Sequence, residues 1–216
     1  MKRTALPVCA AAVLIATAAV SAHGAEQGWY VGGGAGLSHT WFDDDSFNAK
    51  VNAIAPGLSI SGVTKDDDSL MFKLFLGYSF TSFLALEANL FRLGEFATTV
   101  TTTPAGTVIG DFSAYGTSLD AVALLPFGDS WRVFVRGGGV LTRSAVDFTG
   151  TGAAAGVSGI SESHNKFGWK AGAGIAYEFE SGVGFRAEYE YYRVDNGLDQ
   201  EVGVSSVSGS FLYRFK

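Results

Sequence analysis

The stretch "FRAEYEYYRV", Phe185 to Val194, decides the fold because its polar and apolar residues alternate. Arg186, Glu188 and Glu190 take every second position, and the residues between them are aromatic or small. A period of two is typical of a β-strand, since successive side chains leave opposite faces. In a soluble sandwich the apolar face would cover a core. In a membrane barrel it would contact lipid and the charges would be enclosed, so the alternation alone leaves both folds open.

The composition favours a chain with extensive apolar contact. The 216 residues are enough for one ordinary domain or one β-barrel. Charged residues make up only 17%, against about a quarter in typical soluble domains. The net charge is −6 and no basic cluster is present, so we expect no nucleic-acid partner.

The N-terminus has the pattern of a secretory signal. A charged start precedes an uncharged, mostly apolar run over residues 5–20, and small residues follow. This predicts a cleaved signal peptide over residues 1–22, with a cut as late as Ala25. The alternative is a membrane anchor, but the run is short and alanine-rich for a spanning helix. Cys9, the only cysteine, falls in this segment, so we expect no disulfide or thiolate chemistry.

Eight later segments show the period-two pattern, and each is long enough for a tilted transmembrane strand of about 9–11 residues. Strands of soluble sheets average about 5–6 residues. The segments are 28–41, 69–80, 83–96, 111–125, 131–143, 165–179, 183–194 and 204–215.

The connections between these segments alternate in length. Three are short, at residues 81–82, 126–130 and 180–182, and the last, at 195–203, is intermediate. The long connections cover residues 42–68, 97–110 and 144–164. An up-and-down outer-membrane barrel has short turns at one rim and long loops at the other, whereas a soluble sandwich has no reason to sort its loops. We expect the last two long connections to be loops, because they are rich in Thr, Gly, Ala and Ser.

One face of the predicted strands carries no charge through its middle, and aromatic residues gather near its ends. This arrangement is typical of an apolar band between aromatic girdles. The opposite face combines glycine and serine with charges of both signs. These charged residues are Lys73, Glu87, Asp120, Arg132, Arg136, Lys166, Lys170, Glu178, Arg186, Glu188, Glu190 and Arg214. The sequence therefore predicts that the apolar face meets lipid and the charged face lines the interior.

Five stretches, in order, resemble the N-terminal transmembrane domain of outer membrane protein A and its small porin-like relatives. They are "GWYVGGGAGLS" (28–38), "LGYSFTSFLALEANLFRLGE" (76–95), "VFVRGGGVLTRSAVDF" (133–148), "FRAEYEYYRVDNG" (185–197) and "SGSFLYRF" (208–215). The resemblance implies an all-β fold, an eight-stranded antiparallel up-and-down transmembrane barrel over residues 26–216. It also implies the outer membrane of a Gram-negative bacterium, four outer loops and both termini in the periplasm. The peptidoglycan-binding domain of the full-length archetype is not expected.

Glu87, Arg136, Arg186 and Glu188 fall where barrels of this family carry interior charges. An eight-stranded barrel has an interior just wide enough for side chains, and buried charges must be paired. We therefore interpret the four residues as a structural polar network.

The resemblance also has gaps. Val122 and Ala176 replace a Lys and a Glu of the archetype, so the gating pair proposed there does not carry over. The family's final aromatic residue, which the outer-membrane assembly machinery reads, corresponds to Phe215, with the unusual addition of Lys216.

Nothing in the sequence requires a catalytic or metal site. An outer-membrane lipid A deacylase would be expected to have Ser two positions after its histidine. Neither His39 nor His164 has Ser there, so we expect no enzyme and no cofactor. The acidic triplets at residues 43–45 and 66–68 contain carboxylates that suit divalent cations bridging to lipopolysaccharide. A solvated, self-repelling loop is the favoured interpretation, and no metal site is expected.

We expect a structural or surface-interaction role, such as adhesion or envelope integrity, exerted through the outer loops. The expected partners are outer-membrane lipid and lipopolysaccharide, the assembly machinery, and host or surface ligands. The alternative is a narrow porin-like conduit for ions or small solutes, and a lipid-modifying barrel enzyme is the third hypothesis.

Overall fold

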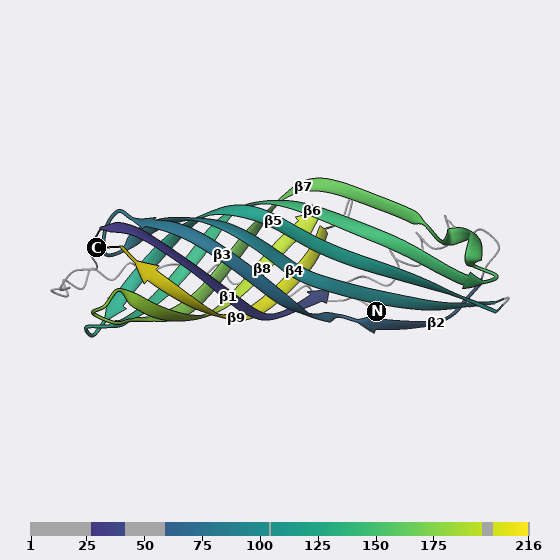
Figure 1. Cartoon of the computed structure of the whole chain (residues 1–216), viewed down its shortest axis with the longest axis horizontal. Helices are drawn as coiled ribbons and strands as arrows, with labels where there is room; N and C mark the ends of the chain where they lie inside the picture. Colours follow the sequence, from purple (N-terminus) through teal and green to yellow (C-terminus); the bar gives the residue numbers. More distant parts are fainter. Residues whose placement is uncertain (1–26, 42–58, 104, 196–200, 216) are drawn as a thin grey trace, which may run out of the picture.

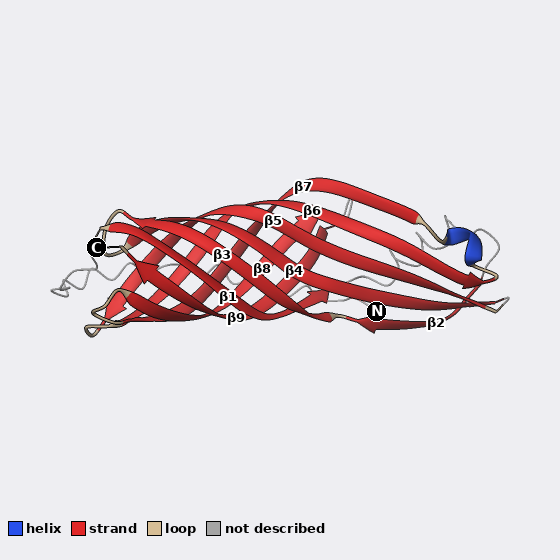
Figure 2. Ribbon diagram, viewed as in Figure 1, coloured by secondary structure: helices blue, strands red, loops and turns tan. Residues whose placement is uncertain are grey.

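The computed structural model describes residues 27–41, 59–103, 105–195 and 201–215, and nearly all of them lie in β-strands (Figure 2). The strands are β1 (Gly28–Trp41), β2 (Ser59–Asp66), β3 (Asp68–Ser79), β4 (Leu84–Thr103), β5 (Gly106–Phe127), β6 (Trp131–Gly152), β7 (Ile160–Glu178), β8 (Val183–Asp195) and β9 (Glu201–Arg214). A short 3₁₀ helix, η1 (Ala155–Val157), lies between β6 and β7. Within these ranges no helix has the length and apolar character needed to cross a membrane. The predicted signal peptide lies outside the described residues.

The strands form one closed antiparallel ring. Strands β3 to β9 pair one after another in chain order, and β1 closes the ring by pairing with both β3 and β9. β2 and β3 are separated only by Asp67, and both pair with β4, so together they occupy one position in the ring. The predicted eight-stranded antiparallel barrel is confirmed.

The register fixes the tilt of the strands. A row of laterally paired residues that starts at Tyr30 passes through Glu87 and Tyr192 and returns to β1 at Thr40, ten residues further along. For eight strands, with about 3.3 Å per residue and about 4.8 Å between strands, this offset corresponds to a tilt of about 40°. A barrel of this size is filled by its own side chains.

The outer surface of the barrel is an apolar belt. Tyr189 is 52% exposed, whereas its neighbours Arg186 and Glu188 are 5% and 3% exposed. The same parity holds on the other strands, where Leu, Val and Phe side chains point outward. These exposures confirm the predicted orientation, with the apolar face outward and the charged face inward. A soluble protein rarely exposes an apolar patch of this extent.

Aromatic side chains form a girdle on the outside at the end of the barrel that carries the short turns. Trp29 contacts Tyr78, with ring centroids 5.1 Å apart, and Trp131 contacts Tyr177 at 4.9 Å. Such girdles mark the interface between membrane and water. The resemblance described above assigns this short-turn end to the periplasm and the opposite end to the outside.

The prediction that residues 97–110 and 144–164 are loops is wrong for most of their length. β4 continues to Thr103 and pairs with β5 from Gly106, and β6 continues to Gly152 before β7 begins at Ile160. β2, within the connection predicted at 42–68, adds to the same sheet. Figure 1 shows these strands running far beyond the ends of β1, β8 and β9. The reason is the β-branched threonine and valine content, which suits a pleated sheet.

A β-bulge in β4 changes which residues face inward. The register of β4 against β5 shifts at Leu93, and both Leu93 and Gly94 are buried. Odd-numbered residues face the interior before the bulge, and even-numbered residues face it afterwards. Phe96 therefore points inward at 3% exposure, although an unbroken alternation from Leu90 places it outside.

Candidate functional site

The middle of the barrel holds a layer of buried charges, each at most 5% exposed. The layer contains four basic and four acidic residues, so its formal charge is zero. They are Lys73, Arg136, Lys170, Arg186, Glu87, Asp120, Glu188 and Glu190. All eight occupy inward-facing positions of β3, β4, β5, β6, β7 and β8. The tilt of the strands brings these positions to similar depth in the barrel. The pairing offsets the desolvation cost of burying each charge.

Glu87 is the centre of the half of this layer that faces the short turns. Its carboxylate accepts hydrogen bonds from the Tyr30 hydroxyl at 2.7 Å, from Arg186 at 2.6 Å and from Arg136 at 2.7 Å. Three donors on one carboxylate satisfy most of its acceptor capacity, so Glu87 is held as an ion in a fixed position.

Glu190 is the centre of the other half. It accepts from Lys73 at 2.7 Å, from Lys170 at 3.0 Å and from the Tyr192 hydroxyl at 3.2 Å. Arg136 joins the two halves, because it also lies 3.3 Å from Glu190.

The remaining acids complete the layer. Glu188 pairs with Lys73 at 2.6 Å, and Asp120 pairs with Lys170 at 2.8 Å while accepting from the Asn89 amide at 3.0 Å. No residue of the layer therefore lacks an oppositely charged partner.

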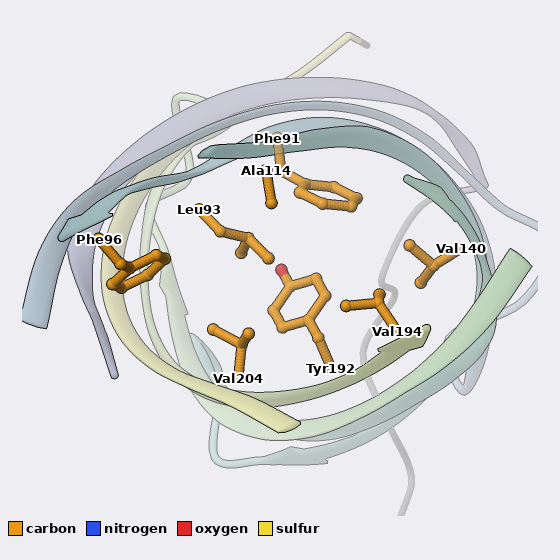
Figure 3. Close-up of a cluster of buried hydrophobic side chains, with 8 residues drawn as sticks. All are labelled: Phe91, Leu93, Phe96, Ala114, Val140, Tyr192, Val194 and Val204. Atoms are coloured by element: carbon orange, nitrogen blue, oxygen red, sulfur yellow. The ribbon is translucent and has the colours of Figure 1, made fainter. Parts of the chain in front are cut away.

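Two clusters of buried apolar side chains lie on either side of the charged layer. The outer cluster consists of Phe91, Leu93, Phe96, Ala114, Val140, Tyr192, Val194 and Val204. Figure 3 shows these side chains reaching into the barrel from strands all around the ring. The Lys170 ammonium lies 5.9 Å from the Phe91 ring and 5.3 Å from the Tyr192 ring, so this cluster borders the charged layer directly.

The second apolar cluster fills the half of the barrel nearer the short turns. It consists of Tyr30, Phe75, Ala85, Val122, Leu124, Phe134, Ala176 and Leu212. The Arg186 guanidinium lies 4.8 Å from the Phe75 ring and 5.2 Å from the Phe134 ring, which are favourable cation–π distances. Val122 and Ala176, which replace the archetype's gating pair, belong to this apolar cluster.

A smaller ionic cluster lies beyond this apolar cluster, at the short-turn rim. Glu178 pairs with Arg132 and accepts from Arg214 Nε at 2.5 Å. Arg214 also donates to Ser79 at 3.0 Å. This cluster connects β3, β6, β7 and β9 across the opening of the barrel.

The structure brings the four predicted network residues together: Arg186 and Arg136 bind Glu87, and Arg136 lies 3.3 Å from Glu188. The predicted set omitted Lys73, Asp120, Lys170 and Glu190, which share the inward parity and complete the charge balance. It also omitted the two apolar clusters. The sequence does contain a signal for these clusters, because aromatic residues occupy inward-facing positions of β3, β4 and β6.

The other sequence candidates are dispersed. His39 Nδ1 lies 2.9 Å from Asp68 Oδ1 on the exterior, and the side chain of His164 is outside the described residues. No group of three or more metal-ligating side chains occurs in the described part of the chain, which excludes residues 43–45. Phe215 is 49% exposed on the barrel exterior, and its N–H donates to the Trp29 carbonyl at 2.9 Å.

The family model of the outer membrane protein beta-barrel domain matches residues 8–215, nearly the whole chain. The chain belongs to this outer-membrane β-barrel family. Membership confirms the predicted location in the outer membrane of a Gram-negative bacterium. Comparison with curated proteins gives no significant match.

Solved structures of other outer-membrane barrels share the fold at low sequence identity. Neisserial surface protein A is 16% identical, with a TM-score of 0.56 and coverage of 87% of this chain and 97% of its own. Outer membrane protein OprG from Pseudomonas aeruginosa is 13% identical, with a TM-score of 0.50 and coverage of 88% and 97%. Ail, the attachment invasion locus protein of Yersinia pestis, is 16% identical, with a TM-score of 0.48 and coverage of 87% and 100%. At this identity the likeness shows the fold alone.

Proposed function

We propose that this barrel is a surface-interaction protein, in which a closed cylinder holds a rigid β-sheet clear of the outer membrane for contact with host or surface ligands. The observation that carries the proposal is the continuous pairing of β5 with β6, which runs from the turn beside Phe127 to the tip at Gly106. The projecting part is therefore the barrel wall itself. A preformed sheet loses little conformational entropy when it binds.

The filled interior supports a scaffold role over the alternative of a porin-like conduit. Polar side chains pair with one another in the centre, and an apolar cluster lies on each side of them. Water-filled pores in this class usually need more strands. The charged layer is, in this proposal, a structural network, and Phe215 is the signal for assembly into the membrane.

The outward face of the projecting sheet offers hydroxyl groups. Thr101, Thr107 and Thr151 are paired laterally on β4, β5 and β6, and Thr99, Ile109 and Thr149 form the next row. This face is uncharged at these positions and can donate and accept hydrogen bonds. It suits a neutral polar partner more than a strongly charged one.

A charge placed on this face tests the proposal. Bacteria that display the wild-type protein should adhere to cultured epithelial cells above the level of an empty-vector strain. Thr107→Lys, at the centre of the threonine face, should lower adherence several-fold because it introduces an unpaired charge at the contact.

Gly156→Lys is the matched control, since it adds the same charge at the tip in η1, where a side chain meets no atom within 4 Å. Equal adherence of the Thr107→Lys and Gly156→Lys strains, at equal surface display, would reject the threonine face as the contact. No adherence above the empty-vector strain would reject the proposed function for these cells.

A further inference from the structure

The outside of the barrel carries a groove of about 1130 Å³ across β1 and β3 to β7. Thr117 lies between Leu90 and Leu141 in one lateral row of outward residues, and the apolar part of the groove is formed by the other side chains of that row, Leu74, Leu90, Leu141 and Phe167. These side chains are 58–72% exposed. Their position on the belt means that lipid hydrocarbon, not water, covers them.

The polar edge of the groove is the next row toward the outer end. Arg92 on β4 and Arg143 on β6 pair laterally with Tyr115 on β5, one on each side. The two arginines lie on strands separated by about 10 Å, because neighbouring strands are about 4.8 Å apart. A pair of outward cations directly above an apolar row is an amphipathic surface.

The two arginines differ in their ion pairing. Arg92 pairs with Glu95 on the same strand, and its side chain is still 56% exposed. Arg143 is exposed and has no ion-pair partner among residues 27–41, 59–103, 105–195 and 201–215. An unpaired guanidinium at the membrane boundary favours an external anion, and its planar fork suits a phosphate.

The charge pattern confines that anion to the arginine row. Asp111 and Asp147, exposed and paired across β5 and β6, lie on the same outward face four residues beyond Tyr115 and Arg143. Their carboxylates repel a phosphate that lies further out. Below the arginines the surface is mainly apolar, so the arginine row is the favourable position for a negative headgroup.

We infer that this groove binds a phosphorylated glycolipid of the outer leaflet, of the lipid A class. Its acyl chains lie along the apolar row, its phosphates bind Arg92 and Arg143, and Tyr115 offers a hydroxyl to the sugars. The site lies beneath the projecting sheet, because β4, β5 and β6 form both. The inference does not depend on the proposed adhesive role.

The test measures binding of lipid A to the folded barrel in a zwitterionic detergent, by native mass spectrometry. Replacing both arginines (Arg92→Gln with Arg143→Gln) should weaken lipid A binding about tenfold or more, since it removes two charge-assisted contacts. Arg193→Gln should leave binding unchanged. Arg193 is an exposed outward cation on β8, outside the groove, and is the matched control.

A variant that should bind lipid A more tightly gives a second test, because loss of folding would not raise the affinity for lipid A. Glu95→Gln frees Arg92 from its ion pair and should tighten lipid A binding, while Gln at this exposed position leaves the fold intact. Dephosphorylated lipid A should bind at least about tenfold more weakly than lipid A to the wild type.

Three outcomes would overturn the inference. Equal lipid A affinity of the double arginine variant and the wild type would mean that annular lipid alone covers the groove. Equal binding of dephosphorylated lipid A would remove the phosphate contact. Phosphatidylglycerol binding as tightly as lipid A would replace the glycolipid with any anionic lipid.

Discussion

Glu87 shows at the scale of one residue how the barrel interior is stabilised. Its carboxylate has three donors in a space closed to water, so removing it leaves Arg136, Arg186 and the Tyr30 hydroxyl without their shared acceptor. We predict that Glu87→Ala lowers the unfolding free energy by about 3–5 kcal/mol, the usual cost of breaking a buried ion pair. Urea unfolding of the barrel in lipid vesicles measures this change.

Asp67→Ala is the control for this prediction. Asp67 separates β2 from β3 and is half-buried, and its contact with Thr40 uses the main-chain carbonyl, which the substitution retains. The expected change is within about 0.5 kcal/mol. Similar unfolding midpoints for Glu87→Ala and Asp67→Ala would contradict the structural role of the charged layer.

Among the strands, β4 depends most on one backbone position. Gly94 follows the bulge at Leu93 with φ +103°, and a Cβ there would lie 2.2 Å from Ser69 Oγ and 2.8 Å from the Leu70 carbonyl oxygen. We predict that Gly94→Ala destabilises the barrel by about 1–3 kcal/mol, because L-residues rarely adopt this conformation.

The comparison for this prediction is Gly137→Ala on β6. A Cβ at Gly137 points toward lipid, with its nearest neighbour, the Lys170 carbonyl oxygen, at 3.8 Å. Unfolding in the same vesicles should show no loss for this variant. An equal loss for both alanine variants would mean that the bulge does not constrain β4.

The strands show which structural features can be predicted from local sequence and which cannot. The alternation in 69–80 and 165–179 predicted both the strands and their lipid face, because a face without charge through its middle, repeated from strand to strand, is explained by contact with lipid. The bulge at Leu93 was not predictable, since it depends on pairing with β5 and on Ser38, whose hydroxyl donates to the Leu93 carbonyl. The extension of β4 and β5 was missed because its threonine-rich sequence has a composition also found in loops.

For the whole molecule, sequence alone predicted the closed barrel and its inward charges but not how the interior is layered. The inward parity places Lys73 and Phe75 on the same face of β3 without giving their depth. Depth follows from the tilt and the lateral offset of ten residues, which are properties of the closed ring. Only the closed ring shows that Phe75 and Phe91 lie on opposite sides of one charged layer.

This layering predicts the electrical behaviour of the whole barrel. An ion crossing the interior would have to pass the outer apolar cluster, break into a charged layer whose members already pair with one another, and pass the second apolar cluster. Each step is costly, because apolar surroundings do not replace the ion's hydration. We therefore expect no resolvable openings above leak when the folded protein is reconstituted in planar bilayers.

Two controls make this absence of current informative. A large porin reconstituted by the same procedure must give its openings, and the barrel itself must migrate faster before boiling than after it, which shows that it is folded. Discrete, reproducible openings of the folded barrel would contradict the sealed interior and favour the conduit. A silent barrel would support the surface roles that we propose for the outer groove and the projecting sheet.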